Sequence, residues 1–265
     1  MQRKQLHYYL VYQSPKDAAA RLRIDKALSM LGCSKLHYSL WRVGRNDVKK
    51  ALAATREHRP LIFKRSRELV SAHVNFEREL YDLGSMAIIA YRLPKGQMGK
   101  RAAVIRALIR TPRIRIGQSL YLIPYLRASK LESYKGKVML QDELFEFLKR
   151  EGVDAHRLTY LRVVYPSSHK VLVKMMIDHE VLTCQKLTSA LKELMKRINN
   201  AEPQELPRLR KTISTYNVRY RAIKGVIFFS HDMMRVDLRS HLKKTYSSLN
   251  LCKRMYRLKS TELLV

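Results

Sequence analysis

Acidic residues are scarce in this chain, in which 22 Asp and Glu stand against 53 Lys and Arg. The formal net charge is +31 over 265 residues, and a surplus of this size makes a folded protein repel itself unless a polyanion neutralises it. DNA, RNA and an anionic membrane surface are the candidate polyanions. Because basic residues recur inside segments with regular apolar periodicity, we expect the folded body itself to be basic, which favours a nucleic-acid partner.

Cysteine is also sparse. The three cysteines, Cys33, Cys184 and Cys252, are far apart and form no CxxC pair. This spacing excludes a zinc site built from cysteines and favours free thiols in a reducing compartment, so we expect a cytoplasmic protein. No apolar run approaches the ~18 residues of a membrane-spanning helix, and no signal-peptide pattern follows the N-terminus. We therefore expect no membrane span.

The common catalytic motifs are missing as well. The sequence holds no GxxxxGKS/T phosphate loop, no GxGxxG after a strand, no HExxH and no GxSxG. Its nine histidines are scattered without the helical spacing of metal ligands. We therefore predict that the protein is not an enzyme, and that it has no cofactor and no metal site.

An internal repeat is present. Residues 9–15 (YLVYQSP) resemble residues 88–94 (IIAYRLP), and residues 38–43 (YSLWRV) resemble residues 118–123 (QSLYLI). Two matches in the same order, 79 and 80 residues apart, indicate a duplicated unit. Each copy is expected to run strand, Pro-containing turn, amphipathic helix and second strand.

The strand patterns indicate which residues face outward. Residues 113–116 (RIRI) alternate with period two, which places both isoleucines in the core and both arginines on the opposite face. In the first copy the same alternation predicts a sheet face that holds His37 and Trp41 and can stack bases. Between the copies, residues 56–67 are expected to form a basic loop around a short strand at 61–63.

A helix at 141–151 and a strand at 158–165 complete the order of a split βαβ, ferredoxin-like pattern. Beyond residue 168 the pattern is helical, with a second helix expected to end before Gly225 and a third to begin after Ser230 as its N-cap. The predicted fold class is α+β, with two ferredoxin-like βαβ-type units in tandem followed by a helical C-terminal region. The expected domains are 1–82, 83–168 and 169–250, with a basic tail at 251–265 that becomes ordered on binding.

The segments YYLVYQSP and AIIAYRLP, each followed by a basic helix and a Ser-Leu-aromatic strand, resemble the ferredoxin-like unit of the ChrB N-terminal family. PaaX-type repressors and the small nuclease subunit of CRISPR adaptation share that unit. In the nuclease subunit an Asp at the end of the first strand binds the metal, whereas the corresponding residues here are Gln13 and Arg92. Neither residue can hold a divalent cation. Since the chain also lacks a chromate-sensing domain and a winged helix, the resemblance gives no support for regulation by a small ligand.

Three functions remain open. A non-enzymatic RNA-binding protein of the ribosome or another ribonucleoprotein is favoured, because the surplus charge extends over every segment. A DNA-binding regulator of the ChrB or PaaX type is the alternative, and it needs only about 6–10 phosphate contacts. A metal-dependent nuclease is the third, and it needs carboxylates where Gln13 and Arg92 stand.

The candidate nucleic-acid-binding residues are basic side chains of the predicted loop, the second copy, the C-terminal helices and the tail. They are Arg56, Arg59, Lys64, Arg65, Arg67, Arg106, Arg110, Arg113, Arg115, Arg219, Arg221, Lys253, Arg254 and Arg257.

Overall fold

The computed structural model describes residues 7–93, 96–126 and 132–262. The fold is mixed α+β, and the chain divides into two compact units. Unit 1 comprises residues 1–133 and 139–176, and unit 2 comprises residues 134–138 and 177–265. The first sequence copy therefore lies in unit 1, as does the second copy except for residues 134–138, and unit 1 ends eight residues beyond the expected end of the second copy at 168.

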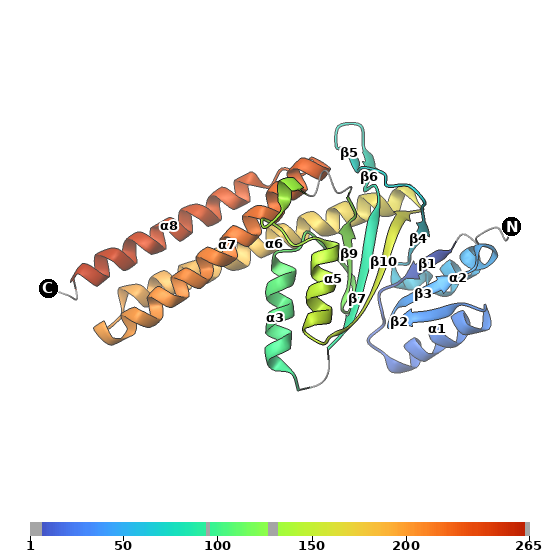
Figure 1. The fold of residues 1–265 in the computed structure, drawn as a ribbon, viewed down its shortest axis with the longest axis horizontal. Helices are drawn as coiled ribbons and strands as arrows, with labels where there is room; N and C mark the ends of the chain where they lie inside the picture. The colour runs from blue at the N-terminus through green and yellow to red at the C-terminus, as the bar shows by residue number, and fades with distance from the viewer. Residues whose placement is uncertain (1–6, 94–95, 127–131, 263–265) are drawn as a thin grey trace. The chain divides into compact units, whose positions relative to one another are not determined.

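Unit 1 is built around a large antiparallel sheet (Figure 1). The first half of the sheet and its helices are β1 (Tyr8–Val11), α1 (Ala18–Met30), β2 (Ser34–His37), β3 (Leu40–Val43), α2 (Val48–Ala54) and β4 (Leu61–Arg65). The second half comprises β7 (Met86–Arg92), α3 (Met98–Ile109), β8 (Ile114–Gly117), β9 (Leu120–Pro124), α5 (Gln141–Arg150) and β10 (Asp154–Val163). A separate hairpin, β5 (His73–Asn75) and β6 (Leu80–Asp82), lies between the halves in the sequence. Short 3-10 turns span Arg45–Asp47, Arg56–His58, Glu132–Tyr134 and Pro203–Glu205.

The strand order is β2-β3-β1-β4-β10-β7-β9-β8, and neighbouring strands are antiparallel. Each half thus follows the same order, with its fourth strand beside its first, then its third and its second. The halves join through β4 and β10, where Phe63 lies opposite Val163. The repeat in the sequence therefore corresponds to a repeat in strand order.

Helices cover one face of each half. In the first half Leu28 of α1 and Ala51 of α2 pack with Leu10 and Trp41 of the sheet. In the second half α3 and α5 lie against β7, β9 and β10, and the core includes Val104 of α3 and Leu148 of α5 (Figure 1). Ile24 and Leu28 in α1, and Leu144 and Leu148 in α5, are four residues apart, so they lie on one side of each helix and bury that side.

The opposite face is also buried, because the sheet curls until its edge strands β2 and β8 approach each other. A Cβ atom at Gly117 of β8 would lie 3.1 Å from Oγ of Ser39, just after β2. His37 of β2 donates from Nε2 to the carbonyl oxygen of Tyr91 at 3.2 Å. Val11 and Ile88, which point away from the helices, are 0% exposed. Each half therefore buries both of its faces.

The expectation of a base-stacking sheet face is wrong, because Trp41 packs beneath α1 and α2 and His37 lies on the opposite face, which the curled sheet buries. His37 and Trp41 are each 1% exposed, so neither ring can reach a base. Residues 38–43 were also expected to form one strand, but Tyr38 and Ser39 form the turn of the β2–β3 hairpin. Gln118 and Ser119 occupy the same turn between β8 and β9, where Ser119 has a φ of 52°.

The described part of unit 2 contains three long helices, α6 (Pro166–Asn199), α7 (Leu206–Met234) and α8 (Arg239–Glu262), of which α6 starts in unit 1. In unit 2 the three helices pack side by side along their lengths (Figure 1). An apolar stripe runs along α6, in which Leu187, Leu191 and Ile198 are 0% exposed. No described helix has the length and apolarity that crossing a membrane requires.

Two predicted helix ends are wrong. α7 continues through Gly225, and Ser230 lies inside α7, where its hydroxyl donates to Oε1 of the buried Glu180 at 2.7 Å. The next helix begins at Arg239, whose backbone N–H donates to Asp237 at 3.0 Å. The basic tail is likewise ordered over its described part, because α8 runs to Glu262 and buries Leu249 and Cys252.

Candidate nucleic-acid interface

The first concentration of positive charge is a groove of about 980 Å³ in the first half of unit 1, which we call the N-terminal basic groove. Its basic lining residues are His7, Arg42, Arg45, Lys64, Arg65 and Arg67. Asp47 is the one acidic residue among the described residues that line it. An open groove with one sign of charge focuses the electrostatic field and attracts phosphate groups.

The register of three strands explains why these side chains converge. β1 lies between β3 and β4 and is antiparallel to both, with Tyr8 opposite Val43 and Lys64. The C-terminal ends of β3 and β4 therefore lie on either side of the start of β1. Arg42, in β3, and Arg45, just after β3, line the groove at this end of the strands. Lys64 and Arg65, in β4, and Arg67, just after β4, line the groove at the same end.

The predicted loop residues are divided between the two ends of β4. Lys64 and Arg65 belong to β4, so the strand is longer than the expected 61–63 and the loop is correspondingly shorter. Arg67 follows the strand. Arg56 and Arg59 precede the strand, with Arg59 in the left-handed region at a φ of 49°. They are exposed but do not line the N-terminal basic groove.

The candidate basic residues of the second copy differ in their surroundings. Arg106 is exposed on α3 and Arg110 is exposed just after it, and Arg115 is exposed on β8, as its period-two position predicts. Arg113 instead turns back to the end of α3, where its guanidinium donates to the carbonyl oxygens of Leu108 and Thr111. The guanidinium also lies 5.8 Å from the ring centroid of Tyr121. These contacts give Arg113 a structural role.

Unit 2 carries a second basic groove, of about 440 Å³, between α7 and α8. The predicted residues Lys253 and Arg257 line it, and Arg210 of α7 joins them. Lys253 donates to Oδ1 of Asn217 at 3.0 Å, which holds its side chain against α7. Arg254 and Arg221 are exposed and Arg219 is partly buried, but they do not line this groove.

Sequence reasoning missed Arg42, Arg45 and Arg210. Arg42 and Arg45 have no basic residue directly beside them in the sequence, whereas Arg210 lies beside Lys211 in a basic stretch of the predicted second helix. The position of Arg42 and Arg45 at a strand end was the available signal.

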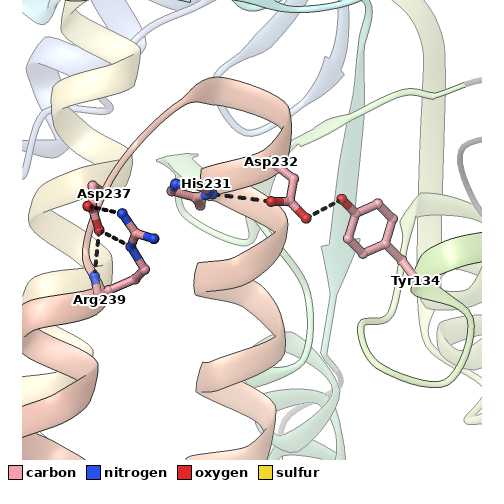
Figure 2. A network of polar contacts seen from close by, with 5 residues as sticks. All are labelled: Tyr134, His231, Asp232, Asp237 and Arg239. Carbon is pink, nitrogen blue, oxygen red and sulfur yellow. Dashed lines mark hydrogen bonds and ion pairs between the residues drawn. The ribbon is translucent and has the colours of Figure 1, made fainter.

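Acidic residues of unit 2 are engaged in local contacts, as Figure 2 shows for the junction of α7 and α8. Asp232 accepts from the Tyr134 hydroxyl at 2.9 Å and contacts Nδ1 of His231 at 3.2 Å. The contact with His231 is the main cause of the lowered pKa of Asp232. Burial is the main cause that raises the pKa of Tyr134 to about 12, and the contact with Asp232 is the second cause. Asp237 forms two bonds with the guanidinium of Arg239, which lower the pKa of its carboxyl.

Three acidic residues of unit 1 are likewise engaged in separate local contacts. Asp25, Asp82 and Asp142 each form an ion pair with a different basic residue, Lys35, Arg162 and Arg157. Among the described residues, no group of three His, Cys, Asp or Glu side chains is placed to hold a metal ion. Gln13 follows β1, and Arg92 is the last residue of β7, with its guanidinium 5.2 Å from the ring centroid of Tyr38.

Comparisons with known proteins do not identify a family. No protein-family model matches the chain, and neither the curated proteins nor the solved structures include a match. The resemblance to the ChrB N-terminal family therefore stays a prediction from short segments.

Proposed function

We propose that this chain is a non-enzymatic nucleic-acid-binding protein that binds RNA through several basic surfaces. The N-terminal basic groove carries the proposal, because strand register brings Arg42, Lys64 and Arg65 to the same end of their strands, and Asp47 is the one acidic residue among the described residues that line the groove. Arginine and lysine side chains are those that most often bind phosphate groups of nucleic acids.

RNA is favoured over DNA because the cationic surfaces are dispersed. The N-terminal basic groove belongs to unit 1, and the groove of Arg210, Lys253 and Arg257 belongs to unit 2. A folded RNA in a ribosome or another ribonucleoprotein can contact separate surfaces of one protein. We therefore propose ribonucleoprotein components as partners.

We also propose that each half of the sheet is a ferredoxin-like unit. The element order β-α-β-β-α-β occurs in both halves, and both have the strand order fourth, first, third, second. A reducing compartment, the cytoplasm, fits the three cysteines, which are buried free thiols.

Crosslinking in native lysate, followed by sequencing of the attached nucleic acid, tests this function. We expect structured RNA to be recovered. Recovery of defined duplex DNA sites would instead support a regulator of the ChrB or PaaX type.

Salt titration of the purified protein gives a second test. The logarithm of the binding constant should fall linearly with the logarithm of salt concentration, by about 0.7 to 0.9 per neutralised phosphate. A binding constant that hardly changes between low and physiological salt would contradict the proposed mode of binding. Magnesium- or manganese-dependent cleavage that one Asp or Glu substitution abolishes would support a nuclease.

A further inference from the structure

A separate pocket of about 570 Å³ lies in unit 1 beside the end of β7. We call it the Arg/Tyr pocket and define it by Arg92, Arg101, Arg115, Tyr38, Tyr91 and Tyr121. Its volume falls within the range of about 300–1,000 Å³ that is typical of small-ligand sites. The N-terminal basic groove has none of these residues in its lining.

The three arginines reach the pocket from different elements. Arg92 ends β7, Arg101 lies in the first turns of α3, and Arg115 lies on β8. No carboxylate is among the described lining residues. Asp154 lies opposite Arg92 on β10, but its ion pair is with His156, at 3.7 Å between Oδ1 and Nε2. The charge of the pocket is therefore suited to an anion.

The start of α3 adds to this positive character. No side chain among the described residues caps the helix at Gln97, and its first turn holds no acidic residue. Gly96, Gln97 and Met98 line the pocket, so the positive end of the helix macrodipole is close to the arginines. Phosphate groups bind at such positions when cationic side chains accompany them.

Aromatic and apolar groups form the rest of the lining. Tyr38 is 47% exposed, and His37 holds its ring edge-on with the centroids 4.7 Å apart. Tyr91 and Tyr121 are stacked with their ring planes 7° apart. Ile105 is 49% exposed beside them. A flat aromatic group can therefore stack on an exposed, positioned ring while an attached anion contacts the arginines.

We propose that the Arg/Tyr pocket binds a single unstacked nucleotide, with its base against Tyr38 and its phosphate between Arg92 and Arg101. The nucleotide is either a free nucleoside monophosphate or the phosphorylated end of an RNA strand. The strand-end form rests on the proposed RNA-binding function, whereas the free form does not.

Binding experiments with the full chain separate these sources. The probes are a nucleoside 5′-monophosphate, and short single-stranded RNAs of one sequence whose 5′ end carries a phosphate or a hydroxyl. If strand ends bind, the 5′-phosphate RNA should bind about tenfold more tightly than the 5′-hydroxyl RNA, as expected for a charge-assisted contact. If free nucleotides bind, the monophosphate should saturate one site and both RNAs should bind equally.

Substitutions locate the site. The double variant Arg92→Ala, Arg101→Ala should remove the 5′-phosphate preference or the monophosphate binding, and leave the affinity for 5′-hydroxyl RNA within about twofold. The matched control, Arg21→Ala with Arg150→Ala, removes two exposed arginines outside the pocket and should retain both. Tyr38→Ala should weaken nucleotide binding but not binding of inorganic phosphate, and circular dichroism checks that each variant is folded.

The proposal would be overturned if the wild-type protein both failed to bind the monophosphate and failed to distinguish the RNA ends. The same result with intact, salt-dependent binding of 5′-hydroxyl RNA would leave the proposed function standing. Loss of binding to every RNA probe, with the monophosphate still bound, would contradict the proposed function alone.

Discussion

Gly225 of α7 approaches the backbone of Lys137 so closely that a Cβ atom at position 225 would lie 2.6 Å from the Lys137 carbonyl oxygen. Alanine favours a helix over glycine by about 1 kcal/mol, but a clash with backbone costs about 1–3 kcal/mol because the backbone cannot rotate away. We expect Gly225→Ala to lower the free energy of unfolding, as measured by urea denaturation. Gly99→Ala in α3 is the control, since a Cβ atom there meets no heavy atom within 4 Å and should be neutral or stabilising. Equal stability of both variants would contradict the close approach.

Reversing two charges in the N-terminal basic groove should weaken RNA binding. We expect Lys64→Glu with Arg65→Glu to reduce affinity by about tenfold or more, because contacts between charged groups contribute about 1.5–3 kcal/mol each. The slope of affinity against salt should also become shallower, since fewer phosphates are neutralised. Fluorescence anisotropy measures both.

The matched control for this experiment is Lys149→Glu with Arg150→Glu, which changes the net charge equally at exposed positions of α5. An equal loss of affinity in the two variants would mean that net charge, and not the groove, determines binding.

Arg113 and Arg115 should differ in their effect on stability, although they are two residues apart. Arg113→Ala removes contacts with the carbonyl oxygens of Leu108 and Thr111 and should cost about 1–2 kcal/mol. Arg115→Ala should change stability by no more than about 0.5 kcal/mol, because its side chain is exposed. Thermal and urea denaturation of the two variants test this difference, and a larger loss for Arg115→Ala would refute it.

Acid should destabilise unit 1 through its buried histidines. Burial lowers the pKa of His169 and of His37 from the usual value, which is about 6.5 in an unfolded chain. Above that pH the histidines are neutral in both states. Below it the unfolded chain binds more protons, so stability falls as the pH drops through the folded pKa values.

His169 provides the variant that tests this pH dependence. Its Nδ1 accepts from the buried backbone N–H of Leu83 at 3.1 Å. His169→Gln keeps an acceptor but cannot be protonated, so the decline in stability below pH ~6.5 should be shallower than in the wild type. His73→Gln, at an exposed position, is the control for replacing a histidine by glutamine. A steeper decline for His169→Gln would reverse the sign that we infer.

Local periodicity predicted the parts of the fold that depend on local burial. The isoleucines of the RIRI segment are 1% and 6% exposed, and the leucine stripe of α6 is buried, because a side chain's face follows from its spacing along a strand or helix. The repeat likewise corresponds to two halves with one strand order.

Features set by distant contacts were not predictable in this way. Gly225 and Ser230 have the residue types of helix ends, but a close backbone approach and a buried acceptor, Glu180, account for them inside α7. The N-terminal basic groove depends on the register that brings Arg42 beside Lys64 from strands about twenty residues apart, which no local pattern contains.

The pairing of β4 with β10 has a consequence for how the two halves can differ. In a homodimer of one such half, every substitution would appear twice. Here the two halves are encoded separately, so equivalent residues can differ in their contacts. Tyr12 donates to Asp25, whereas its counterpart Tyr91 lines the Arg/Tyr pocket. Likewise Gln13 stands where the second half has Arg92. A single chain can therefore change the chemistry of one half without altering the other.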